Sequence, residues 1–193
     1  MQRLAGICCL ALAVVLAGCA GVRRIDSQVT SFAPLAVSAG ASYRFERLPS
    51  QQADADALAR LEAMAEQALA KVGLRYQPDQ AQLVVQVASS RRVQRISFDG
   101  GGWGLPLGRV PGHAPLGGRR LFPGLDTQTL YLRELSLIVR DSASHRVLFE
   151  TYADNDNPWS DDEAVLPAML DAALQGFPTP PTGVRRIPID IPR

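Results

Sequence analysis

All three cysteines lie within the first nineteen residues of the chain, at Cys8, Cys9 and Cys19. The rest of the 193-residue chain can therefore form no disulfide and offers no thiolate ligand for a metal. A domain in this part must be held together by an apolar core, and a hydrophobic share of 47% is enough for one. The length predicts a single domain.

The segment before Cys19 has the pattern of a bacterial export signal. Arg3 is followed by an uncharged apolar run over 4–16, which is shorter than the roughly 20 residues that a membrane-spanning helix needs. The run ends in Leu-Ala-Gly-Cys at 16–19, which resembles the lipobox of bacterial lipoproteins. The alternative is an ordinary secretory leader with an incidental cysteine.

The lipobox resemblance implies cleavage between Gly18 and Cys19 and the attachment of acyl chains to Cys19. We therefore predict a signal peptide over 1–18 and a membrane partner for the mature chain, because two or more acyl chains hold a protein stably at a bilayer. Residues 19–27 are expected to form a lipidated tether. In enterobacterial lipoproteins an Asp after the cysteine favours the inner membrane, so Ala20 favours the periplasmic face of the outer membrane.

Periodicity predicts an α+β fold over 28–178, with an antiparallel-rich mixed sheet and two helices packed on one face. The 3.6-residue repeat of apolar side chains predicts helices over 54–72 and 160–175. The alternation of apolar and polar residues predicts strands over 28–32, 42–48, 82–98, 130–140 and 146–153. The proline-rich residues 179–193 are expected to form an extended tail.

Local signals refine these elements. Asp54 or Asp56 is suited to cap the first helix and Gly73 to end it, whereas Glu62 is expected to point away from the apolar stripe. Ser160 and Glu163 have the spacing of a capping box for the second helix. Paired serines at 89 and 90 interrupt the alternation of the long strand and predict a bulge or an edge twist.

Residues 100–124 contain nine glycines and four prolines without any periodicity, which predicts a long flexible loop between two strands. Bulky apolar side chains in such a loop often contact a partner or dip into a membrane interface. The candidates for these contacts are Trp103, Leu105, Leu107 and Phe122. The alternative is that the loop folds back on its own domain.

Known catalytic and cofactor motifs do not match the sequence. The glycines after 100 lack the spacing of a dinucleotide site, and Gly118 stands where a phosphate-binding loop needs lysine. His113 and His145 have no metal-site or hydrolase neighbourhood and are expected to be solvated turn residues. We therefore expect no catalytic residue, no metal and no cofactor. The net charge of +1 disfavours nucleic acid as a partner.

An acidic cluster between Asp154 and Glu163 is the strongest alternative to a non-enzymatic function. Acids near a helix start offset its partial positive charge, which is the simpler interpretation. A periplasmic hydrolase would instead need Asp154, Asp156, Asp161 and Asp162 to line a concave pocket with raised pKa values.

The chain also resembles the bacterial lipoproteins grouped as domain of unknown function 4136. The resemblance lies in an early aromatic strand (Tyr43-Arg44-Phe45), a helix ending in Lys71-Val72-Gly73-Leu74, a strand that follows Pro78-Asp79-Gln80-Ala81, and a final Phe177-Pro178. The resemblance covers about residues 28–178. Two positions depart from the family pattern: Gln82 stands where Asp is usual, and Phe45 stands where Trp is common. The family has no established catalytic residues. The resemblance therefore implies a small α+β envelope lipoprotein. The apolar residues of the glycine-rich loop favour a non-enzymatic function, in which the protein binds a partner or supports an envelope assembly.

Overall fold

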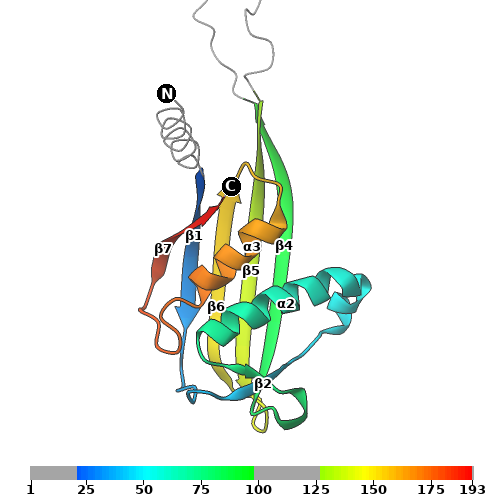
Figure 1. Cartoon of the computed structure of the whole chain (residues 1–193), viewed down its shortest axis with the longest axis vertical. Coiled ribbons are helices and arrows are strands. Elements are labelled where there is room, and N and C mark those ends of the chain that lie inside the picture. Colours follow the sequence, from blue (N-terminus) through cyan, green and yellow to red (C-terminus); the bar gives the residue numbers. More distant parts are fainter. Residues whose placement is uncertain (1–20, 98–126, 193) are drawn as a thin grey trace, which may run out of the picture.

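The computed structural model describes residues 21–97 and 127–192 (Figure 1). Several predicted site residues lie outside this part of the chain, and so does the glycine-rich segment. These residues are Gly18, Cys19, Trp103, Leu105, Leu107, His113 and Phe122.

One mixed sheet of seven strands, in the order β3-β2-β4-β5-β6-β1-β7, organises the described residues. The short β2 runs parallel to β3 and β4, and the other neighbours are antiparallel, which confirms the predicted antiparallel-rich α+β fold. The strands are β1 (Val22–Phe32), β2 (Ser42–Phe45), β3 (Arg75–Tyr76), β4 (Leu83–Ser97), β5 (Thr127–Asp141), β6 (Val147–Asn157) and β7 (Val184–Pro192).

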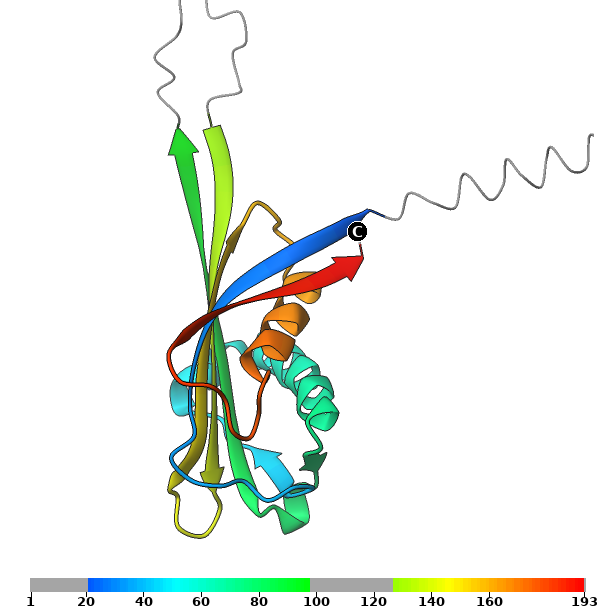
Figure 2. The ribbon, with the colours of Figure 1, turned by 90° about the vertical axis from the view of Figure 1, so that its left-hand side faces the viewer.

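Helices α2 (Ala55–Lys71) and α3 (Asp162–Ala173) lie on the same face of the sheet, as predicted (Figure 2). Two short 3₁₀ helices, Pro49–Asp54 and Pro78–Gln80, flank β2 and β4 in the chain. Helix α2 packs over β4, and α3 packs over β5, β6, β1 and β7. We call the face that carries these helices the inner face of the sheet and the opposite one the outer face.

The core lies between the inner face and the two helices. Alternate residues of β4 and β5 meet there in register, with Val85 opposite Val139 and Val87 opposite Leu137. All four are buried, and the helices cover them with buried side chains such as Leu69 and Met169. Because each fully buried aliphatic side chain contributes about 1.5 to 3 kcal/mol, this layer supplies the main stabilisation of a domain without disulfides.

The observed cap agrees with the prediction at α2 and differs from it at α3. The carboxylate of Asp54 accepts a hydrogen bond from the amide of Ala57, and Gly73 ends α2 with a φ of 86°. Helix α3 is capped by Asp161, which accepts from the amide of Ala164, so the predicted capping box at Ser160 is wrong. The helix begins one residue later than that box requires.

Both ends of the domain depart from the prediction. The expected tether 19–27 is wrong from Val22 onward, because β1 begins there and pairs with β7 from Val22–Pro192 to Thr30–Val184. The expected tail is likewise strand β7, with Ile187 buried in the core. Pro188 and Pro192 are tolerated because β7 is an edge strand, where a missing N–H breaks no ladder bond.

Two smaller expectations are also wrong. Strands β4 and β5 pair without interruption from Leu83–Asp141 to Ser97–Thr127, so no bulge forms at the paired serines; the register shift lies instead at Val139/Arg140, opposite β6. Glu62 is buried rather than turned to solvent, because Arg47 binds both of its carboxylate oxygens, at 2.9 and 2.6 Å.

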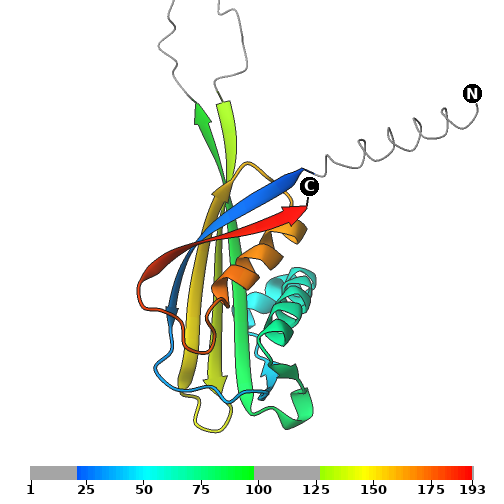
Figure 3. The same cartoon turned by 60° about the vertical axis from the view of Figure 1, so that its left-hand side comes forward.

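The strands separate into two arms at one end of the molecule. Beyond the Tyr131–Asn157 pair, β4 and β5 continue without β6 and project from the sheet as the β4–β5 hairpin. Residues 22–27 of β1 pair only with β7 and bend toward the inner face (Figure 3). Helix α3 begins between these two arms.

Candidate functional site

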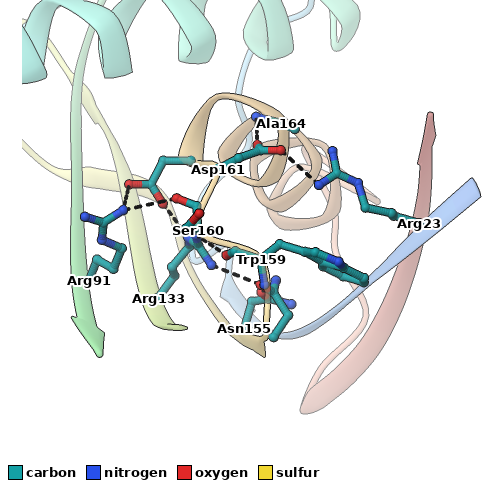
Figure 4. A network of polar contacts seen from close by, with 10 residues as sticks. Arg23, Arg91, Arg133, Asn155, Trp159, Ser160, Asp161 and Ala164 are labelled. Atoms are coloured by element: carbon teal, nitrogen blue, oxygen red, sulfur yellow. Dashed lines mark hydrogen bonds and ion pairs between the residues drawn. The ribbon is translucent and has the colours of Figure 1, made fainter. Parts of the chain in front are cut away.

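Arginines from three strands converge on the start of α3 (Figure 4). Arg23 comes from the β1 arm, Arg91 from β4 and Arg133 from β5. All three bind the short segment 159–162 that connects β6 to α3. This arginine network therefore joins both arms of the sheet to the same helix end.

Arg133 is the centre of the network and is only 1% exposed. Its Nε donates to Oδ1 of Asp162 at 2.6 Å, and its Nη2 donates to the carbonyl oxygen of Trp159 at 2.8 Å. Its Nη1 donates to Oδ1 of Asn157 at 3.2 Å, so each guanidinium nitrogen has a partner. A buried charge needs such partners, since the free energy of desolvation is otherwise uncompensated.

The remaining contacts of the network lie nearer the surface. Nη1 of Arg91 donates to Oδ2 of Asp162 at 2.8 Å, so this carboxylate is shared by two arginines. Nη1 of Arg23 donates to Oδ2 of Asp161 at 2.9 Å, while its guanidinium lies 5.6 Å from the ring centre of Trp159. The hydrogen bond from Arg23 lowers the pKa of Asp161 below its ordinary value, so this carboxylate is ionised at neutral pH.

The acidic cluster proposed for a hydrolase is divided by the fold. Asp161 and Asp162 belong to the arginine network, whereas Asp154 and Asp156 lie at outer-face positions of β6, because inward residues alternate with them. The pKa of Asp154 is raised, first by desolvation and then by the nearby Glu134, but that of Asp161 is lowered. The four carboxylates therefore do not share a pocket, and the described residues contain no group of three or more acidic, His or Cys side chains able to hold a metal.

A hollow of about 570 Å³ lies beside the β5–β6 turn. Its lining comes from the β1–β2 connection, the start of β4 and the β5–β6 turn, and includes Leu35, Gln82, Asp141 and Arg146. Asp141 accepts hydrogen bonds from both the amide and the hydroxyl of Ser144, each at 2.7 Å, which lower its pKa. Its carboxylate is thus used to close the turn rather than directed at a ligand.

His145 lies in the same turn with a φ of 57° and an exposed side chain, as expected of a solvated turn residue. The role of Arg133 was not predicted from the sequence, although a signal for it was present. Arg133 occupies an inward position of β5 in line with Leu135, Leu137 and Val139, where an apolar residue is expected. A single arginine in an apolar row predicts a buried partner.

Among the described residues, none of the helices has the length and hydropathy required to cross a membrane.

One solved structure shares the fold at low sequence identity, and two others are less similar. A PDZ domain protein from Parabacteroides distasonis is 13% identical with a TM-score of 0.52, and the match covers 93% of this chain but 41% of that one. The PelC dodecamer from Paraburkholderia phytofirmans is 13% identical with a TM-score of 0.46, covering 80% of this chain and 99% of that one. A variant of the same PelC is 14% identical with a TM-score of 0.44, covering 77% and 94%.

No curated protein matches the sequence. A family model does match, over residues 28–179, which is most of the chain and nearly the span of the resemblance noted from the motifs. The chain therefore belongs to the family described as Domain of unknown function (DUF4136).

Proposed function

We propose that the chain is a membrane-anchored periplasmic lipoprotein of the outer membrane, and that it binds a partner or supports an envelope assembly rather than catalysing a reaction. The observation that carries the proposal is the short distance in sequence between the lipobox cysteine, Cys19, and the first paired residue of the sheet, Val22. Three residues of extended chain span at most about 10 Å.

This spacing has a direct mechanical consequence. Val22 is fixed in the sheet by its pairing with Pro192, so an acyl group on Cys19 would hold the domain against the bilayer. The β1 arm and the β4–β5 hairpin extend toward the same end of the long axis (Figure 1). The predicted contact residues Trp103, Leu105, Leu107 and Phe122 lie between β4 and β5 in the sequence, so they would act on the membrane side of the domain.

The non-enzymatic role is supported by the structural bonds that occupy three of the carboxylates. Asp161 and Asp162 are each bound by arginine, and Asp141 is bound within its own turn. A general acid or base must be able to exchange a proton near neutral pH, and the lowered pKa values of Asp161 and Asp141 are the opposite of that requirement.

The anchor is tested by Cys19→Ser in the full chain, expressed in a Gram-negative host and fractionated. We expect the wild-type protein in the outer-membrane fraction, with a mass raised by acyl chains and lowered by loss of 1–18. The serine variant should retain its leader or appear without lipid in the soluble fraction. The double variant Cys8→Ser/Cys9→Ser is the matched control, because both residues lie within the leader and should leave the product unchanged. An unaltered mass and membrane attachment of Cys19→Ser would refute the proposal.

A further inference from the structure

The outer face of the sheet carries an exposed apolar patch that none of the described helices covers. Phe32, Tyr152 and Val184 are 55%, 41% and 70% exposed, although they come from three different strands. Thr30 of β1 lies opposite Tyr152 of β6 on one side and opposite Val184 of β7 on the other. Phe32 follows two residues along β1 on the same face, so the side chains form one continuous surface.

Carboxylates border this patch along β6. Glu150 lies opposite Phe32, and Asp154 and Asp156 follow Tyr152 at alternate positions, so all three share the outer face. Strand β6 contains no basic residue. Within the described part of the chain, no ion pair involves Glu150, Asp154 or Asp156. Arg186 of β7, opposite Gln28, marks the margin of the surface. We call the set Phe32, Glu150, Tyr152, Asp154, Asp156 and Val184 the acidic-aromatic face.

We propose that the acidic-aromatic face docks a basic segment of a protein partner that carries both apolar side chains and arginine or lysine. Charge complementarity identifies the occupant: apolar side chains fit the patch around Tyr152, and cations at either side fit Glu150 and Asp154. The same carboxylates repel anionic lipid head groups, so a bilayer is a poor occupant. The inference rests on the proposed binding role but not on the lipid anchor.

One hydrogen bond and one raised pKa on the acidic-aromatic face support its role as a docking surface. The hydroxyl of Tyr152 donates to the carboxylate of Glu150, which fixes the ring on the face. Desolvation and the neighbouring Glu134 raise the pKa of Asp154, so keeping this side chain charged at neutral pH opposes folding. A cation from a partner would offset this unfavourable term. A residue that is unfavourable for stability is commonly found where function requires it.

The docking is expected to use side chains rather than strand addition. Strand β7 forms one edge of the sheet, and Pro188 and Pro192 lack the N–H groups through which a further strand would pair. At the other edge, β3 contains only Arg75 and Tyr76. The proposed docking therefore uses the side chains of the outer face rather than these two edges.

The probe is a fluorescent ten-residue peptide of alternating arginine and leucine, titrated against the detergent-solubilised full chain. Its counterpart of alternating glutamate and leucine controls for apolar binding. The triple variant Glu150→Gln/Asp154→Asn/Asp156→Asn should weaken binding of the basic peptide by about tenfold or more, which corresponds to about 1.4 kcal/mol. The variant Phe32→Ser/Tyr152→Ser should weaken it to a similar extent.

Matched controls separate a site from general charge attraction. Glu66→Gln/Asp79→Asn/Glu163→Gln removes the same charge from exposed acids elsewhere, and Tyr76→Ser removes a similarly exposed aromatic. Both should bind within about twofold of the wild type, a change below about 0.5 kcal/mol. The proposal is overturned if the control triple variant loses as much affinity as the face variant, if the acidic peptide binds equally well, or if the wild type does not bind. A failed anchor in the Cys19→Ser experiment would leave these outcomes unaffected.

Discussion

Replacing Arg133 by methionine tests whether the arginine network stabilises the contact between the strands and the start of α3. The substitution removes three donors from a site that is 1% exposed: the hydrogen bonds to Asp162, Asn157 and the carbonyl of Trp159. Breaking a fully buried pair costs about 3 to 5 kcal/mol. Asp162, however, keeps Arg91 at 2.8 Å and its side chain is 35% exposed, so its charge is not left alone. We therefore expect a loss of about 2 to 3 kcal/mol in the free energy of unfolding.

The assay is equilibrium urea denaturation, supported by thermal melts in which Tm should fall by about 4 to 12 °C for a domain of this size. Arg92→Met is the matched control, because its bond to Glu134 joins side chains that are 73% and 54% exposed. Such a pair contributes less than about 1 kcal/mol. Arg133→Lys keeps the charge but loses the forked geometry, and should fall between the wild type and the methionine variant. If Arg133→Met were as stable as Arg92→Met, the arginine network would not stabilise the folded domain.

Two further predictions concern the cap of α3 and the last strand, β7. Asp161→Ala should cost about 1 kcal/mol at neutral pH by removing the cap of α3. Because the hydrogen bond from Arg23 lowers the pKa of folded Asp161 below its ordinary value, this difference should be full at neutral pH and be lost as the pH falls through the acidic range toward that lowered pKa, as measured by denaturation at a series of pH values. Ending the chain after Gly183 removes β7 with buried Ile187 and leaves β1 without its partner from Val22 to Ser27, so stability should fall by more than about 3 kcal/mol. Resistance to limited proteolysis would report this loss, and a truncated chain as resistant as the wild type would mean that 184–192 is a tail after all.

Elements with a strong local pattern could be predicted from the sequence. Helix α2 repeats apolar residues over four turns between Asp54 and Gly73, and both boundaries agree with the structure. The β5–β6 hairpin is equally local, because Asp141 closes its own turn with Ser144. These patterns act over a few residues, so no distant partner is needed to interpret them.

Elements whose partner lies far away in the chain could not be placed in this way. Val22 and Pro192 stand next to each other in the sheet but at opposite ends of the described sequence, and each segment alone looks like a polar or proline-rich linker. Glu62 looks solvent-exposed until Arg47 is placed beside it. The acidic residues 154–163 form one cluster in sequence, but the two faces of the sheet separate them.

The fold class, the main helices, the family and the lipobox pattern at Cys19 follow from local properties: the apolar period, the capping residues and short motifs. The pairing of residues 22–30 with 184–192, the burial of Arg133 and the gathering of Phe32, Tyr152 and Val184 on one face appear only in the folded chain. Strand register and charge pairing cannot be inferred locally, because they depend on which distant residues the packed core brings together.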